Sequence, residues 1–144
     1  MALRDIVFFN EEISYTIKDK QKIRQWIFDT IKAEGFRRVG ELSFILCSDE
    51  YLLSINQEYL DHDTYTDIVT FDSSEEEDII EGDIFISVER VIENAQKFNV
   101  SQKDELHRVI IHGVLHLCGY YDKNKEDKEL MTQKENEYLL KRTF

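Results

Sequence analysis

The sequence predicts one α+β domain over residues 1–144, an αβα sandwich in which helices cover a mixed β-sheet. Three observations support this fold class. The 144 residues are 42% hydrophobic and 33% charged, which is enough apolar material for one core and leaves little room for a second domain. Short apolar segments alternate with amphipathic ones, and no linker separates them. Their order is not the regular strand–helix repeat of a doubly wound parallel sheet, so mixed strand pairing is expected.

The first half of the chain is expected to form three strands and two helices. The strands are predicted at residues 6–10, 12–17 and 41–48. Residues 18–35 have the apolar spacing of an amphipathic helix, which Gly35 ends. Its buried face is predicted to comprise Ile23, Trp26, Ile27, Thr30 and Ile31. Ser48 is expected to cap a helix that runs to about Tyr59.

The second half is expected to form two strands and three helices. The strands, 66–72 and 82–88, flank the acidic segment 73–82. The helices are predicted at residues 88–99, 103–117 and 125–142. Ser101 and Asn124 are expected to cap the second and third of these helices, and Gly119 to stop the second.

The charge balance restricts how the protein could meet a polyanion. The chain has 30 acidic and 18 basic residues, a formal net charge of -12. This balance favours solubility and argues against a protein that coats nucleic acid by bulk attraction. A polyanionic ligand would therefore have to bind at a local basic surface.

The cysteines and the N-terminus indicate the compartment. Cys47 and Cys118 lie in apolar surroundings and are expected to be buried free thiols in a reducing environment. The N-terminal segment reaches acidic residues too soon for a signal peptide, and no apolar run is long enough to span a membrane. A cytoplasmic protein without membrane association is therefore expected.

The segment HGVLHLCGYYD, residues 112–122, is the most informative motif. His112 and His116 are four residues apart, about 40° around a helix axis, and can therefore chelate one ion. Two such histidines can also simply pack in a core. This helix, however, is apolar nearly all round and so buried, and buried imidazoles need partners, which a metal ion provides. His107 lies about 140° away from His112 and is not expected to join them.

The third ligand is expected to be Asp122, with Glu126 and Cys118 as weaker candidates. Gly119 can adopt the left-handed conformation that ends a helix and turns the chain back, which would carry residue 122 beneath the histidines. Two histidines and a carboxylate leave one position open on Zn²⁺, as in catalytic sites. The alternative for Asp122 is a cap on the last helix.

The 112–122 motif, with TDIVTF at 66–71 and GDIFIS at 82–87 ahead of it, resembles the YbeY family of bacterial metal-dependent endoribonucleases. The three motifs occur in the family's order between about Asn56 and Met131. The resemblance implies a zincin-like fold and one Zn²⁺ per chain on His112, His116 and position 122. It also implies cleavage of single-stranded RNA in 16S ribosomal RNA maturation and ribosome quality control, with the small ribosomal subunit as partner.

Two positions depart from the family pattern. Position 122 is usually histidine and is Asp122 here, which can still ligate zinc. The family also has an arginine after the tyrosine of its Asn-x-x-Tyr-Arg motif, and Leu60 stands there in this chain. A guanidinium is a natural clamp for phosphate, so Leu60 bears on the cleavage rate more than on the fold. His62 is a possible substitute.

Two other functions stay open. A metalloprotease-like hydrolase is disfavoured because Gly113 stands where zinc proteases carry their glutamate base. A non-catalytic, zinc-stabilised ribosome-assembly factor is favoured by Leu60 and by the net charge.

Further residues are candidates for supporting roles. Asp67 and Asp83, beside predicted strands, could support a ligand or orient water, or could serve only as strand-end turns and caps. The expected RNA-contacting surface consists of Lys22, Arg24, Arg37 and Arg38, although a solvated helix face explains these cations equally well.

Overall fold

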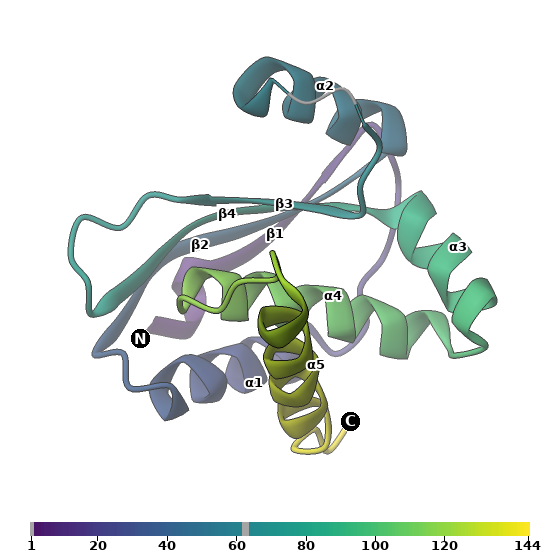
Figure 1. Ribbon diagram of the computed structural model, residues 1–144. Coiled ribbons are helices and arrows are strands. Elements are labelled where there is room, and N and C mark those ends of the chain that lie inside the picture. Colours follow the sequence, from purple (N-terminus) through teal and green to yellow (C-terminus); the bar gives the residue numbers. More distant parts are fainter. Residues whose placement is uncertain (1, 62–63) are drawn as a thin grey trace.

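The computed structural model describes residues 2–61 and 64–144, in which helices lie on both faces of one four-stranded sheet (Figure 1). The strands are β1 (Ile6–Glu11), β2 (Arg38–Cys47), β3 (Ile68–Asp72) and β4 (Ile79–Ser87). The helices are a short 3-10 turn, η1 (Ala2–Asp5), and α1 (Lys20–Ala33), α2 (Asp49–Leu60), α3 (Val88–Phe98), α4 (Gln102–Leu117) and α5 (Lys125–Leu139). In Figure 1, α1, α4 and α5 lie below the sheet and α2 lies above it. The predicted αβα fold class is confirmed.

The sheet is mixed, with the strand order β1-β2-β4-β3. β2 runs parallel to both β1 and β4, whereas β3 pairs antiparallel to β4 at the edge, with Ile68 opposite Ile86 and Phe71 opposite Asp83. Successive side chains of each strand point to opposite faces of the sheet. On β4, Ile84 and Ile86 therefore face α4, and Asp83 faces the other way.

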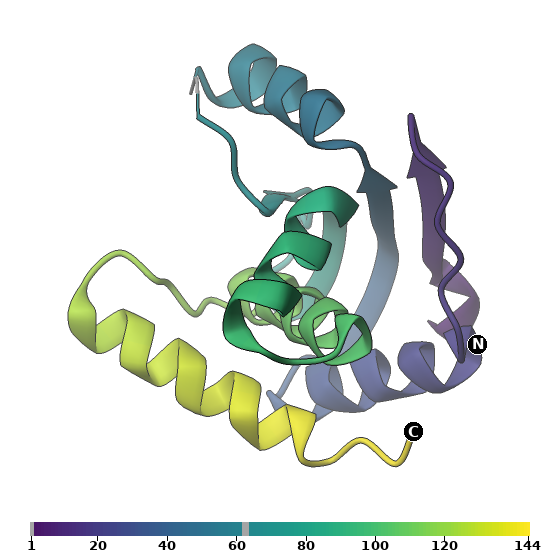
Figure 2. The same ribbon diagram turned by 90° about the vertical axis from the view of Figure 1, so that its right-hand side faces the viewer.

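The predicted strand at residues 12–17 is wrong. The backbone leaves the sheet at Glu12, which has a positive φ of 57°, and the chain then runs back beside β1 towards α1 (Figure 2). Ile13, Tyr15 and Ile17 still pack against the core. Their alternation resembles that of a strand, but this segment covers the sheet edge from a loop, with Asn10 donating its side-chain N–H to the Tyr15 carbonyl at 3.1 Å.

The helix boundaries follow local side-chain chemistry. Ser48, Ser101 and Asn124 accept hydrogen bonds from the backbone N–H groups three residues on, as predicted, and so satisfy donors that a helix start leaves free. Gly119 has a φ of 106°, and its N–H and that of Tyr120 bond back to carbonyls of α4. The chain therefore reverses directly after the helix that carries the two histidines.

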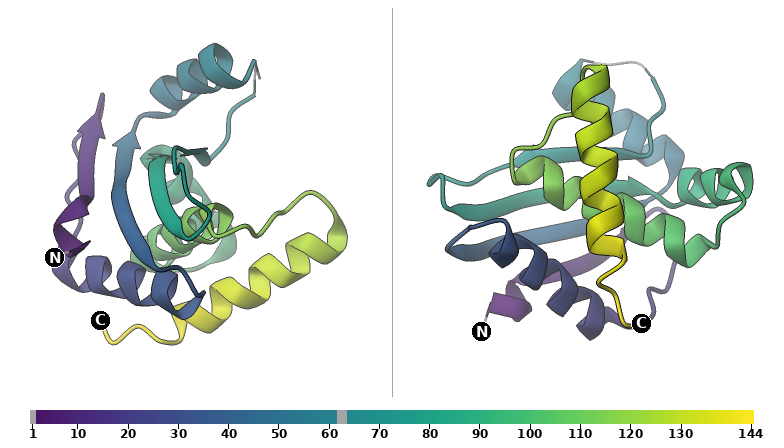
Figure 3. Two further views of the ribbon diagram at one scale, coloured as in Figure 1. Left: turned by 90° about the vertical axis from the view of Figure 1, so that its left-hand side faces the viewer. Right: turned by 60° about the horizontal axis from the view of Figure 1, so that its bottom comes forward.

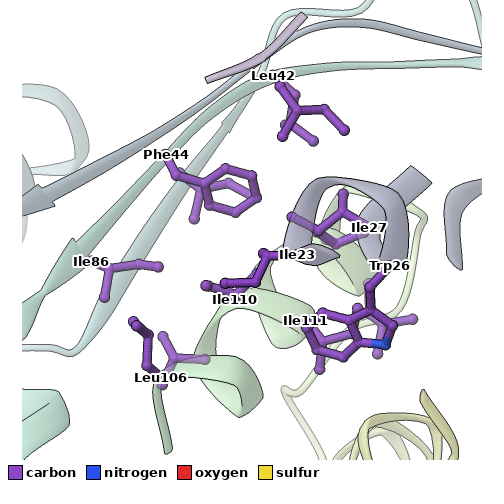
Figure 4. Close-up of a cluster of buried hydrophobic side chains, with 14 of the residues drawn as sticks. Ile23, Trp26, Ile27, Leu42, Phe44, Ile86, Leu106, Ile110 and Ile111 are labelled. Carbon is purple, nitrogen blue, oxygen red and sulfur yellow. The ribbon is translucent and has the colours of Figure 1, made fainter. Parts of the chain in front are cut away.

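The main core lies between the sheet and α1 and α4 (Figure 4). The predicted buried face of α1 is confirmed in full. Side chains labelled in Figure 4 come from α1 (Ile23, Trp26, Ile27), from β2 and β4 (Leu42, Phe44, Ile86) and from α4 (Leu106, Ile110, Ile111). α5 then packs across α4 from outside (Figure 3). The sheet, α1 and α5 thus pack around α4 and fix the orientation of its one remaining open face.

A smaller apolar cluster joins α2 to the opposite face of the sheet. It contains Cys47, which is buried, whereas Cys118, directly after α4, is only partly buried; both thiols are free. Burial raises the pKa of each thiol to about 12, so neither is poised as a thiolate. Among the described residues, every helix is too short or too polar to cross a bilayer.

His107 packs away from His112, as its helical position predicts. Its ring packs against those of Trp26 and Phe144, and Nη1 of Arg142 donates to its Nδ1 at 2.7 Å. Burial, and then the charge of Arg142, lowers the pKa of His107 to about 4.

This depressed pKa predicts a loss of stability in acid. Between about pH 6.5 and pH 4, His107 becomes protonated in the unfolded chain but stays neutral in the folded protein. The free energy of unfolding therefore falls as the pH falls through this window. The difference reaches up to about 3 kcal/mol. Urea denaturation at several pH values should show a shallower dependence for His107→Gln than for the natural protein. Equal slopes would contradict the assignment.

Candidate metal centre

Two elements bring three possible metal ligands together. α4 presents His112 and His116 one turn apart, with ring centroids 5.3 Å from each other, and the turn at Gly119 returns the chain so that Asp122 faces both. One donor atom from each of the three residues lies within 4.8 Å of the others. Within the described part of the chain, no other such group of histidine, cysteine and acidic side chains was found.

The distances in this group fit a metal ion better than direct hydrogen bonds. Nε2 of His112 lies 3.4 Å from Oδ2 of Asp122, and Nε2 of His116 lies 3.6 Å from Oδ1. Both exceed the usual length of a hydrogen bond. Ligands about 2.0–2.1 Å from a tetrahedral zinc ion are separated by about 3.4 Å. The donor set therefore suits zinc in both chemistry and spacing. Neither Cys118 nor Glu126 belongs to the group.

A salt-bridged tyrosine cluster fixes the loop that carries Asp122. The hydroxyl of Tyr120 donates to Oε1 of Glu34, at the end of α1, at 2.6 Å. Tyr138 and Lys134 of α5 reach the other oxygen of the same carboxylate. The loop is thus tied to two helices within two residues of Asp122, and this restricts where the carboxylate can lie.

Glu135 orients His112 and is the functional residue that the sequence reading missed. Its Oε2 lies 2.6 Å from Nδ1 of His112. Because an ionised carboxylate only accepts, Nδ1 carries the proton and Nε2 is left free to face Asp122. Burial opposes the charged form of His112, but the hydrogen bond and charge of Glu135, followed by the charge of Asp122, outweigh it and raise the pKa of His112. The available signal was a glutamate in the buried stripe of α5, between Met131 and Tyr138.

Replacing Glu135 by Gln should weaken metal binding by about 10- to 100-fold, because carboxylates that orient a ligating histidine have effects of this size. Competition with a coloured chelator would measure the affinity for zinc. Glu137→Gln is the matched control, since Glu137 is exposed and pairs only with Lys134 and Lys141 among the described residues. Equal zinc affinity in the two variants would show that Glu135 does not act on the site.

The ligand group opens into a cleft of about 510 Å³ between α4 and the edge strand β3. Leu60, at the end of α2, and Asp67, just before β3, also line it. Further lining residues come from α4 and α5, namely Glu105, Arg108, Val109 and Glu135.

Burial, and then the charge of Asp67, raises the pKa of Glu105. In contrast, burial followed by the charge of His112 lowers the pKa of His116, which favours the neutral imidazole that a metal requires.

The structure does not bring the other candidate residues to the cleft. Asp83 is exposed on the sheet face that points away from α4. Arg37 is paired with Asp78 and Glu76, and Nε of Arg24 donates to the Ile6 carbonyl. Lys22 lines a separate pocket beside α5, and Arg38 is exposed at the start of β2. Arg108 is the basic residue that does line the cleft. His62 lies outside the described residues.

Comparison with known proteins gives concordant matches over nearly the whole chain. A family model described as "Endoribonuclease YbeY" matches residues 6–143. A protein with the same description from Cytophaga hutchinsonii is 51% identical over 144 residues, all of both chains. Another from Christiangramia forsetii is 49% identical over 139 residues, 96% of this chain and 95% of the relative. The solution structure of TM1509 from Thermotoga maritima is 30% identical, with a TM-score of 0.65, and covers 93% of this chain and 86% of that one.

Proposed function

The chain belongs to the YbeY family of endoribonucleases, and from this membership we propose that it is a zinc-dependent enzyme that cleaves single-stranded RNA. The single observation that carries the proposal is the group of His112, His116 and Asp122 in an open cleft, spaced as zinc ligands are. We further propose that its substrate is 16S ribosomal RNA during maturation and quality control of the small subunit, and that it therefore works in the cytoplasm.

The protein's own residues define what the site can do. Zinc bound there would act as a Lewis acid on a phosphodiester and make a water molecule more acidic. His112 and His116 would hold the ion from the rigid helix, and Asp122 would hold it from the loop, where its side chain is 41% exposed. Glu135 holds the proton of the neutral His112 ring on Nδ1, so that Nε2 is the nitrogen directed at the ion. Because three residues would supply ligands, a four-coordinate zinc ion would keep one position for water or substrate.

A metalloprotease-like activity has less support. Gly113 occupies the place of the protease glutamate, and the helix there lies directly against Ile68 and Ile84 of the sheet. The cleft therefore has no carboxylate at the position from which that base would act. Of the other carboxylates that line the cleft, Glu135 is engaged with His112 and Arg108, and Glu105 lies seven residues, roughly 10 Å, before His112 along α4.

A cleavage assay with a metal control tests the proposed function. The zinc-loaded protein should cut a single-stranded oligonucleotide of 16S ribosomal RNA sequence, and should leave the same sequence intact in a duplex. A chelator should stop the cleavage, and added zinc should restore it. If the zinc-loaded protein cuts no RNA above the chelated control, the zinc-stabilised assembly factor becomes the better account.

A further inference from the structure

We propose that Arg108 is the phosphate-binding cation of the cleft, and that it contacts the RNA backbone beside the scissile phosphate. This inference rests on the proposed endoribonuclease function and specifies how the cleft holds its substrate. Arg108 precedes His112 by four residues on α4, and the two side chains therefore share one face of the helix. Both line the same cleft, and the Arg108 side chain, which also borders a second pocket beside α5, is 36% exposed.

The charges around the cleft make this cation necessary for an anionic ligand. Among the described residues that line the cleft, Arg108 is the single lysine or arginine. The acidic lining residues are Asp67, Glu105, Asp122 and Glu135. An RNA strand that approached this wall without a cation would meet several carboxylates on a protein whose net charge is already -12. The metal site and Arg108 are therefore where its phosphates can be neutralised.

The guanidinium is held in place before any ligand arrives. Nη1 of Arg108 donates to Oε1 of Glu135 at 2.8 Å, and Nη2 donates to the side-chain oxygen of Asn136 at 2.7 Å. These two bonds use two of the five N–H donors of an arginine, so the others can serve a phosphate. A fixed planar fork loses little conformational entropy on binding, which suits contact with phosphate oxygens.

Among the described residues, the wall opposite α4 supplies no replacement. Leu60 lines the same cleft from the end of α2 and offers only an apolar side chain. Arg108 therefore gives the cleft, from the side of α4, a cation that the described part of the α2 wall does not provide. An arginine introduced at Leu60 would occupy the same cleft and could take over part of this task.

A purely structural role for Arg108 is the competing explanation, because its guanidinium also neutralises Glu135, whose side chain is only 8% exposed. The two roles differ in what they change. A structural arginine affects stability and zinc affinity, whereas a phosphate contact affects the salt dependence of RNA binding by protein that is already saturated with zinc.

The experiment measures binding of zinc-saturated protein to a single-stranded RNA with 2′-O-methyl groups, which prevent cleavage that uses the ribose hydroxyl, at several salt concentrations. Arg108→Gln should bind about tenfold more weakly and should lower the slope of log affinity against log salt by about 0.7, the value for one phosphate on a single strand. Arg37→Gln, which removes the same charge from an ion-paired arginine outside the cleft, should leave the slope unchanged. Adding Leu60→Arg to Arg108→Gln should recover most of the slope.

The outcomes separate the inference from the proposed function. If the natural protein neither binds nor cleaves single-stranded RNA, the proposed function fails. If it does both, and Arg108→Gln keeps the natural slope when saturated with zinc, the proposed contact is wrong and the residue is structural. Should Arg108→Gln fold poorly because Glu135 is left unpaired, the double variant Arg108→Gln/Glu135→Gln removes that charge as well. A natural slope in the folded double variant would equally overturn the proposal.

Discussion

Replacement of His116 by alanine is expected to remove the bound zinc and to lower RNA cleavage by roughly three orders of magnitude or more. The reason is the ligand count. Without His116 the site keeps His112 and Asp122, and two protein ligands do not make a zinc site of the usual three- or four-ligand kind. Zinc content after dialysis and the rate of cleavage of a single-stranded RNA should fall together.

Loss of the metal should also appear as a loss of stability. A ligand that binds only the folded state stabilises it by about 2.7 kcal/mol when its concentration is a hundred times its dissociation constant. Zinc should therefore raise the melting temperature of the natural protein and leave that of His116→Ala unchanged. His107→Gln is the matched control, because His107 is a buried histidine of the same helix whose ring packs on Trp26 and Phe144. It should retain zinc and cleavage although it is less stable.

Replacement of Asp122 by histidine tests the third ligand. A histidine at position 122 can also bind zinc, so the variant should keep one ion per chain. If Asp122→His abolishes zinc binding while the protein stays folded, or if His116→Ala retains a full equivalent of zinc, the ligand assignment is wrong.

The parts of the fold that the sequence predicts well are those decided by neighbouring residues. Ser48, Ser101 and Asn124 cap their helices through backbone groups only three residues away, and a local pattern suffices to find them. The segment 12–17 has the alternation of a strand but forms none, because pairing requires a partner edge, which depends on the whole sheet. Its alternating apolar residues do pack inward, but from a loop.

The same distinction holds for the metal centre. His112 and His116 are related by one helical turn, and the glycine turn that returns Asp122 lies within the same eleven-residue motif. Glu135 and His112 are 23 residues apart and meet only because α5 crosses α4, so no spacing rule connects them. Arg108 is hard to predict for the opposite reason. The cations of the N-terminal half cluster in the sequence, whereas the described lining of the cleft contains a single, isolated arginine.

Introducing the protease glutamate as Gly113→Glu is expected to destabilise the protein by about 3 kcal/mol or more, through overpacking and an unpaired buried carboxylate. A Cβ atom at residue 113 would lie 2.9 Å from Cδ1 of Ile68 and 3.0 Å from Cγ2 of Ile84. Ile84 is fully buried, so it has little room to move. The absence of that glutamate is thus a packing requirement where α4 meets the sheet, as well as a difference in chemistry.

Two further variants, measured by urea denaturation, separate the destabilisation due to overpacking from that due to the buried carboxylate. Gly113→Ala gains up to about 1 kcal/mol of helix propensity but brings in the same Cβ contacts, so it should be neutral or modestly destabilising. Ile68→Val removes the nearest of the contacting atoms at the half-buried edge strand. It should recover part of the stability of Gly113→Ala and little of that of Gly113→Glu, whose charge stays buried. A Gly113→Glu protein as stable as the natural one, and able to cleave peptides with zinc, would instead restore the metalloprotease interpretation.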